Sequence, residues 1–134
     1  MTAEQLAKLH ARASDRPWSL DSFQSQLAQS NTILEFDAHA FAIGLFALDD
    51  VELLQIATDP AFQRRGLAAR VLKAFEVQAK AKGCTRGFLE VAESNLPAQG
   101  LYETSGWQEV GRRPNYYKCA DGDREDAILM SKDL

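Results

Sequence analysis

The 134-residue length favours one domain, spanning residues 1–134, and leaves little room for a second. With 46% hydrophobic and 25% charged residues, the composition is that of a folded globular protein and excludes a disordered chain. The net charge of −4 argues against a broad nucleic-acid-binding surface, and the longest apolar run, residues 40–48, is too short to cross a membrane.

The first part of the chain predicts two helices. Thr2 and Gln5 have the spacing of a capping box, and the helix that they begin ends before 15–17, Asp-Arg-Pro. Ser19 is positioned to cap the second helix. Apolar residues recur at helical spacing in both segments: Leu6, Leu9 and Ala13 in the first, and Leu20, Phe23 and Leu27 in the second.

Three strand-like runs follow, at residues 32–36, 41–48 and 51–58. The short polar segments between them suit tight turns and predict an antiparallel meander. Residues 66–82 then carry apolar side chains at i, i+4 spacing and predict a long helix. Gly83 is placed to end that helix as its C′ residue.

The last third predicts a strand at 87–91, a helix at about 96–105 capped by Asn95, and two strands at 107–112 and 127–131 joined by a polar loop. The order is two helices, three strands, helix, strand, helix and two strands. A meander followed by helical crossovers favours the α/β class, with helices layered around one central mixed sheet.

The segment 63–68, Gln-Arg-Arg-Gly-Leu-Ala, joins a predicted strand to the long helix. The first N–H groups of a helix lack partners and carry partial positive charge, so they can bind an anion such as a pyrophosphate. Gly66 lets the backbone approach a ligand, and Arg64 and Arg65 can screen its charge. Taken alone, such a segment is more often the solvated start of a helix, and it is neither a GxGxxG fingerprint nor a P-loop.

Two segments together resemble the signatures of the GNAT acetyltransferases. Residues 63–68 are similar to the Q/R-x-x-G-x-G/A pyrophosphate loop of that superfamily, with Ala68 in place of its last glycine. Asn95, followed seven residues later by Tyr102, resembles its second signature. The resemblance implies the GNAT fold, a central mixed sheet with helices on both faces. Family members usually begin with a strand, whereas this chain starts almost at a helix, so we expect the first edge strand to be absent.

Three further strings resemble the RimI-type ribosomal-protein-alanine N-acetyltransferases: Leu89-Glu90-Val91, residues 112–117 and residues 121–130. The similarity covers roughly residues 3–131. It implies an enzyme that transfers acetyl from acetyl-CoA to the N-terminal alanine α-amine of a small-subunit ribosomal protein. Two alternatives stay open: a GNAT enzyme acting on a lysine side chain or a small-molecule amine, and a non-catalytic acyl-CoA-binding protein.

The resemblance also implies roles for individual residues. Glu90 matches the proton acceptor of the family, acting directly or through water. Tyr102 matches the proton donor to the CoA sulfur. Because a phenol is a weaker acid than a thiol, a hydrogen bond from Tyr102 to the sulfur is sufficient for this role. Without the resemblance, the sequence predicts only a solvated carboxylate at a strand end for Glu90 and a buried helix residue for Tyr102. The resemblance implies three groups of contacts with acetyl-CoA. The first is the backbone of Ile56, Ala57 and Thr58, on a strand that splays from its neighbour. The others are the Asn95 side chain and the loop of Arg64, Arg65, Gly66, Leu67, Ala68 and Ala69.

Tyr116 and Tyr117 either close over the first residues of the substrate or only pack together. His10 and His39 are isolated from any ligand pattern, so we expect surface or capping residues and no metal site. Residues 1–14 carry no apolar signal-peptide core, which predicts a cytoplasmic protein with reduced cysteines. The expected partners are acetyl-CoA and a ribosomal protein N-terminus, without nucleic acid or membrane, and the expected state is a monomer or weak dimer.

Overall fold

The computed structural model describes residues 1–134. The elements follow the predicted order: α1 (Ala3–Ala13), α2 (Leu20–Leu27), β1 (Thr32–Phe36), β2 (Ala40–Ala47), β3 (Asp50–Thr58), η1 (Pro60–Phe62), α3 (Leu67–Ala81), β4 (Arg86–Ala92), α4 (Leu96–Thr104), β5 (Gln108–Lys118) and β6 (Arg124–Asp133). The short 3-10 helix η1 is the one element that the sequence did not predict. The six strands form one sheet in the order β1-β2-β3-β4-β6-β5, in which only the β3–β4 pair is parallel.

The predicted caps are present. The Gln5 N–H donates to Thr2 Oγ1 at 3.2 Å, and the Thr2 N–H donates to Gln5 Oε1 at 2.8 Å, which completes the capping box. Ser19 accepts from the Ser22 N–H at 3.1 Å and starts α2. Gly83 has a φ of 92°, as expected for a residue that ends α3 in the left-handed region.

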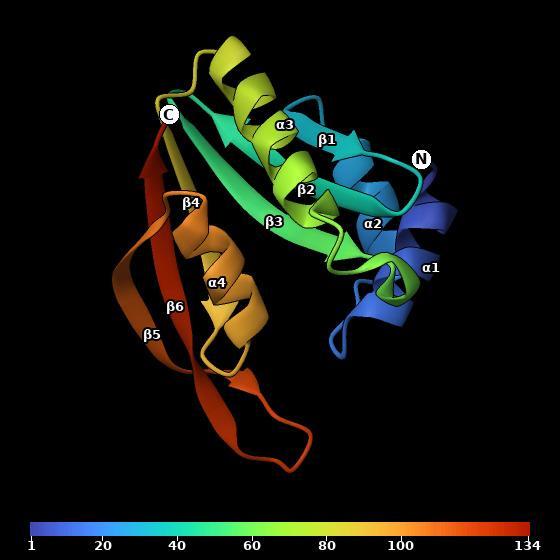
Figure 1. Cartoon of the computed structure of the whole chain (residues 1–134), viewed down its shortest axis with the longest axis vertical. Helices are drawn as coiled ribbons and strands as arrows, with labels where there is room; N and C mark the ends of the chain where they lie inside the picture. The colour runs from blue at the N-terminus through green and yellow to red at the C-terminus, as the bar shows by residue number, and fades with distance from the viewer.

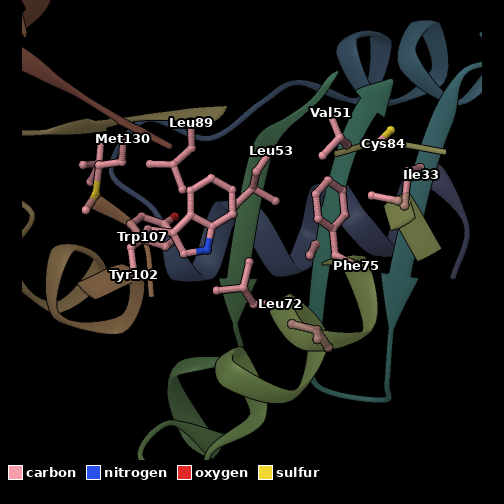
Figure 2. Close-up of a cluster of buried hydrophobic side chains, with 14 of the residues drawn as sticks. Ile33, Val51, Leu53, Leu72, Phe75, Cys84, Leu89, Tyr102, Trp107 and Met130 are labelled. Carbon is pink, nitrogen blue, oxygen red and sulfur yellow. The ribbon is translucent and has the colours of Figure 1, made fainter. Parts of the chain in front are cut away.

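Helices cover both faces of the sheet (Figure 1). On one face, α3 and α4 pack over a 16-residue cluster in which Phe75, Leu72, Leu53, Leu89 and Trp107 meet (Figure 2). On the other face, α1 and α2 close a six-residue cluster: Leu6, Leu9, Phe23, Phe41, Ile43 and Ala57. The prediction of a mixed sheet with helices on both faces is thus confirmed, and β1, the first strand, forms the edge of the sheet.

His10 corrects one prediction, because it is buried rather than a surface residue. Only 2% of its surface is exposed, and its Nδ1 accepts the Trp18 N–H at 3.0 Å, so it fixes the α1–α2 connection. Burial lowers the pKa of His10 and keeps the ring neutral, with a partly opposing contribution from Gln55. The sequence could not reveal this burial, because the aromatic rings against His10, Phe23 and Phe41, come from α2 and β2.

The C-terminal hairpin corrects another prediction. The expected polar loop between 112 and 127 is mostly strand, because β5 runs on to Lys118 and β6 begins at Arg124. Almost every residue of β5 is exposed, so its two faces do not differ in polarity. The alternation of apolar and polar residues that identifies a half-buried strand is therefore missing from the sequence.

A bulge in β3 sets the shape of the sheet. Gly44 pairs with Leu53 and Ile43 pairs with Gln55, which leaves Leu54 as an extra residue without a partner. The parallel pairing of β3 with β4 ends at the same place, at Leu53 and Leu89. Beyond it the two strands separate, and Figure 1 shows them diverging away from the C-terminal end of the chain. The rest of β3 and the end of β4 therefore line a gap in the sheet.

Candidate active site

The free edge of β3 presents backbone groups to this gap. The Asp59 N–H donates to the His39 carbonyl on the β2 side at 2.8 Å. Because hydrogen-bonding direction alternates along a strand, the backbone of Ala57 also faces β2, while Ile56 and Thr58 face the gap. The Thr58 carbonyl accepts from Gln63 Nε2 at 3.4 Å on that outer side. Of the three predicted backbone contacts, two thus point where a ligand can reach them.

Thr58 carries a second polar group without a partner. Its Oγ1 is buried and forms no hydrogen bond, and it is the only buried side-chain oxygen or nitrogen in this state. Buried hydroxyl groups are normally hydrogen-bonded, because leaving one unpaired costs free energy. The unpaired hydroxyl and the strand edge that faces the gap therefore occur at the same residue.

The loop before α3 has the backbone shape of an anion site. Arg64 and Gly66 both have left-handed φ angles, 64° and 77°. Gly66 is the N-cap of α3 but supplies no side-chain cap, so the first N–H groups of the helix are free. A Cβ on Gly66 would meet no atom within 4 Å, so the φ angle rather than space calls for glycine. Successive N–H groups around left-handed residues form a concavity that suits phosphate oxygens.

Arg65 is held at the side of this loop. Its guanidinium lies 5.1 Å from the Phe62 ring centroid, and Phe62 stacks on His39 with centroids 3.5 Å apart and an interplanar angle of 6°. His39 thus supports the loop and is not isolated on the surface. Of the remaining loop residues, Leu67 and Ala68 are half-buried and Ala69 is exposed.

Glu90 lies on the sheet face opposite α3 and α4. Its Oε1 forms an ion pair with Arg113 Nε at 2.9 Å, and its side chain is 22% exposed, so solvent and ligands can reach it. The pKa of Glu52 on β3 is raised by burial and then by the charge of Glu90, against the effect of Arg113. Burial and the charge of Glu90 also raise the pKa of Tyr117. Two carboxylates, one guanidinium and one phenol therefore share this part of the gap.

Tyr102 on α4 lies in the cluster on the α3 and α4 face of the sheet, opposite to the face of Glu90. It is 5% exposed and packs against Trp107, with ring centroids 6.3 Å apart. Burial, followed by the neighbouring Tyr117, raises the pKa of Tyr102 far above its usual value. The phenol stays neutral at physiological pH and keeps its proton for donation. Tyr117 contributes to the raised pKa of Tyr102, and Glu90 contributes to the raised pKa of Tyr117, so Tyr117 lies near both predicted catalytic residues.

The predicted tyrosine pair packs together and against two arginines. The two rings meet edge to face, with centroids 5.0 Å apart. Arg113 lies over Tyr116 at 5.5 Å and Arg16 over Tyr117 at 5.0 Å. Tyr116 is 50% exposed and can therefore contact a ligand.

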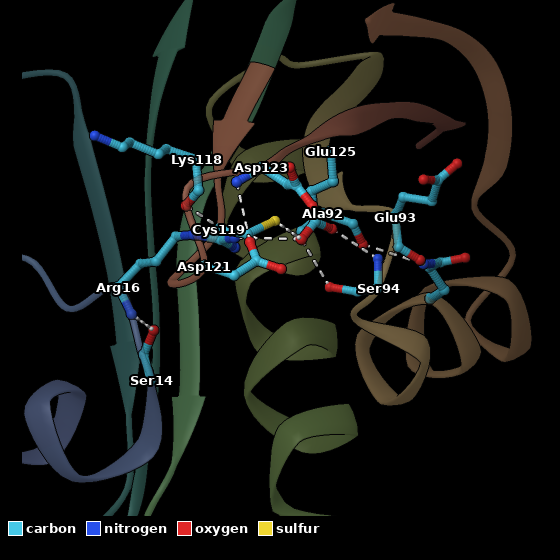
Figure 3. Close-up of polar contacts among 11 residues, drawn as sticks. Ser14, Arg16, Ala92, Glu93, Ser94, Lys118, Cys119, Asp121, Asp123 and Glu125 are labelled. Atoms are coloured by element: carbon cyan, nitrogen blue, oxygen red, sulfur yellow. Dashed lines mark hydrogen bonds and ion pairs between the residues drawn. The ribbon is translucent and has the colours of Figure 1, made fainter. Parts of the chain in front are cut away.

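Asn95 has a structural role at the start of α4. Its side-chain oxygen accepts the Ala98 N–H at 3.3 Å, and the amide N–H groups form no hydrogen bond within the protein. Just before it, Ser94 is held by Glu125 through its N–H at 2.8 Å and its hydroxyl at 3.0 Å (Figure 3). Glu125 also pairs with Arg16 at 3.3 Å and accepts from Cys119 Sγ at 3.3 Å. One carboxylate thus joins the α1–α2 connection, the α4 entry and the β5–β6 hairpin.

The hydrogen bonds from the Ser94 backbone and side chain hold the pKa of Glu125 at about 2, below its usual value of 4.5. A carboxylate with a lowered pKa stabilises the fold above its unfolded-state pKa and loses that contribution as the pH falls through its folded-state pKa. We expect Glu125→Gln to be less stable than the wild type at pH 6, with the difference shrinking between about pH 4.5 and pH 2. Urea unfolding at each pH measures it, and Glu103→Gln on the exposed face of α4 is the control. A difference that does not change with pH would contradict this role for Glu125.

Sequence reasoning gave no role to Glu52, Arg113, Arg16 or Glu125. Arg113 and Glu125 lie inside the C-terminal strings that carry the resemblance, so those strings could have indicated them. Glu52 lies in a predicted strand with no motif around it, and nothing in the sequence indicates that Glu90 is its neighbour.

The sequence and fold were compared with known proteins. The model of the acetyltransferase (GNAT) family matches residues 4–107. The [ribosomal protein bS18]-alanine N-acetyltransferase of Escherichia coli strain K12 is 39% identical over 129 residues, which are 92% of this chain and 85% of the relative. The crystal structure of the ribosomal-protein-S18-alanine N-acetyltransferase from Escherichia coli superposes with a TM-score of 0.90 at 34% identity, over 98% of this chain and 87% of that one.

A more distant likeness concerns the fold alone. Arabidopsis thaliana NAA60, solved in complex with acetyl-CoA, has a TM-score of 0.83 at 16% identity, over 98% of this chain and 93% of that one. No helix of this chain is both long and apolar enough to span a membrane. No three His, Cys, Asp or Glu side chains gather where they could hold a metal ion.

Proposed function

We propose that this chain, which belongs to the acetyltransferase (GNAT) family, acetylates the N-terminal alanine amine of a small-subunit ribosomal protein with acetyl-CoA as cosubstrate. The proposal places the enzyme in the cytoplasm and takes residues 1–134 as its catalytic domain. One observation carries it: an anion-binding loop and an unpaired strand edge lie on one side of a gap, and a solvent-accessible carboxylate, Glu90, lies on the other. The likeness over 92% of the chain to an enzyme of that name supports the choice of substrate.

The residues present fit acetyl-CoA. The left-handed loop at Arg64 and Gly66, with the free N–H groups of α3, would hold the pyrophosphate. The strand edge at Ile56 and Thr58 would pair with the amides of the pantetheine. When bound, acetyl-CoA supplies a thioester, the activated acyl group of the reaction. Tyr102, kept neutral by burial, offers its hydroxyl to the sulfur as negative charge develops there.

Glu90 would accept the proton that the attacking amine must lose. An α-ammonium with a pKa near 8 needs about 1.4 kcal/mol to lose its proton at pH 7, whereas a lysine with a pKa near 10.4 needs about 4.6 kcal/mol. This difference favours an N-terminal amine over a lysine side chain.

Mass spectrometry of two peptides tests the proposal. One carries the N-terminal sequence of ribosomal protein bS18 beginning with a free alanine, and the other is N-blocked and contains lysine. We expect acetyl-CoA and the enzyme to add one acetyl group to the first peptide and none to the second. Acetylation of the lysine peptide alone would replace the proposal with the side-chain alternative. Acetylation of neither, with acetyl-CoA still bound, would rule out the ribosomal substrate.

A further inference from the structure

Glu52 and Glu90 lie on the same face of the sheet. Glu52 pairs with Phe88 in the parallel β3–β4 register, and Glu90 follows Phe88 by two residues, so the side chains of all three point the same way. That face is opposite to the one buried by α3 and α4, because Leu53 and Leu89 point into their cluster. The two carboxylates therefore lie diagonally across the last paired rungs before the gap.

The charges at this place do not balance. Arg113 forms its ion pair with Glu90, and none of the ion pairs of the structure includes Glu52. Glu52 nevertheless interacts with the charges of both Glu90 and Arg113. One negative charge is thus left over beside the proposed base. The Glu52 side chain is exposed enough for a ligand to reach it.

A single cation would complete the group. The proposed reaction brings one, because an N-terminal amine arrives at pH 7 mainly as an ammonium. We propose that Glu52 is a specificity-determining residue that binds the α-ammonium of the incoming N-terminus and presents it to Glu90. The inference rests on the proposed function and deepens it, since it divides the work between two carboxylates. Glu52 captures the charged amine, and Glu90 takes its proton.

The division predicts different kinetic effects for the two carboxylates. Glu52→Gln should raise the KM for the alanine peptide roughly tenfold at pH 7, the lower end of the range for one charged hydrogen bond, with little change in kcat. The effect should fade by pH 9.5, where the amine is neutral. Arg113 and Glu90 face Glu52, and Tyr117 faces Glu90; between pH 7 and pH 9 the substrate amine is the group that titrates.

Binding measured without turnover tests the inference directly. Isothermal titration in the presence of CoA compares the alanine peptide with a des-amino analogue in which propionyl replaces alanine. We expect the wild type to prefer the amine about tenfold at pH 7 and Glu52→Gln to reduce that preference to about twofold. Glu35→Gln on β1, also a strand glutamate without an ion-pair partner, should keep the full preference, and neither variant should change the thermal midpoint.

The possible outcomes distinguish a failure of the Glu52 inference from a failure of the proposed function. An undiminished preference in Glu52→Gln, or an equal loss for both peptides, would overturn the inference and leave the proposed function intact. If the wild type acetylates the lysine peptide instead, the proposed function fails, and the same comparison is made with that peptide and its des-amino form. A wild type that binds none of these peptides would contradict both.

Discussion

Glu90→Gln is expected to lower kcat for the alanine peptide by about 10²–10³-fold at pH 7, the usual contribution of a general base. The variant keeps the shape of the side chain and an oxygen beside Arg113 but cannot accept a proton from the amine. The loss should narrow at pH 9, where most of the α-amine is already neutral. Thiol release from CoA, followed as a function of pH, measures it.

The chain supplies a matched control for this substitution. Glu93 lies three residues later and pairs with Arg112 at 2.6 Å, much as Glu90 pairs with Arg113. Glu93→Gln changes the net charge equally and removes an equivalent ion pair, and it should leave kcat within about twofold, because exposed pairs contribute little. If Glu90→Gln kept more than half of the activity at pH 7, the proton acceptor would be another group, and Glu52 would be the first to consider.

Gly44→Ala is expected to lower the free energy of unfolding by about 3 kcal/mol, the upper end of the range for overpacked cores. A methyl group on Gly44 would lie 2.1 Å from the Glu52 carbonyl oxygen and 2.6 Å from Phe75 Cζ. The first of these is backbone and cannot rotate away, so β2 and β3 must move apart at the bulge. Chemical denaturation of the wild type and the variant measures the loss.

Gly100→Ala is the control, and it is expected to raise the free energy of unfolding rather than lower it. Gly100 lies inside α4, and a Cβ there would meet no atom within 4 Å. Alanine is favoured over glycine in a helix by about 0.5–1 kcal/mol, so this variant should be more stable than the wild type. Equal stability changes in the two variants would show that the bulge does not depend on Gly44.

The features that the sequence predicted correctly depend on residues close together in the chain. Thr2 and Gln5 form a cap three residues apart, and Gly83 ends α3 immediately after its last turn. The order of elements follows from such signals and from hydrophobic periodicity. The GNAT resemblance identified the candidate site for the same reason, because each of its motifs is short and continuous.

What the sequence did not predict depends on contacts between distant segments. The bulge at Leu54 depends on Gly44 of β2, which allows the close approach of β3. Glu52, Glu90 and Arg113 meet only after three strands have taken their places in the sheet. The long hairpin escaped prediction because β5 is exposed along nearly its whole length, so burial left no pattern in its sequence.

The short parallel seam between β3 and β4 has a consequence beyond catalysis. Residues Asp50–Leu53 pair with Arg86–Leu89, and no other rungs join the β1–β3 half of the sheet to the β4–β6 half. A molecule bound in the gap would act as a missing strand between the halves. At a concentration 100 times its Kd, such a ligand adds about 2.7 kcal/mol to the stability of the fold. If acetyl-CoA occupies the gap as proposed, the resistance of the enzyme to proteolysis therefore rises with the acetyl-CoA concentration.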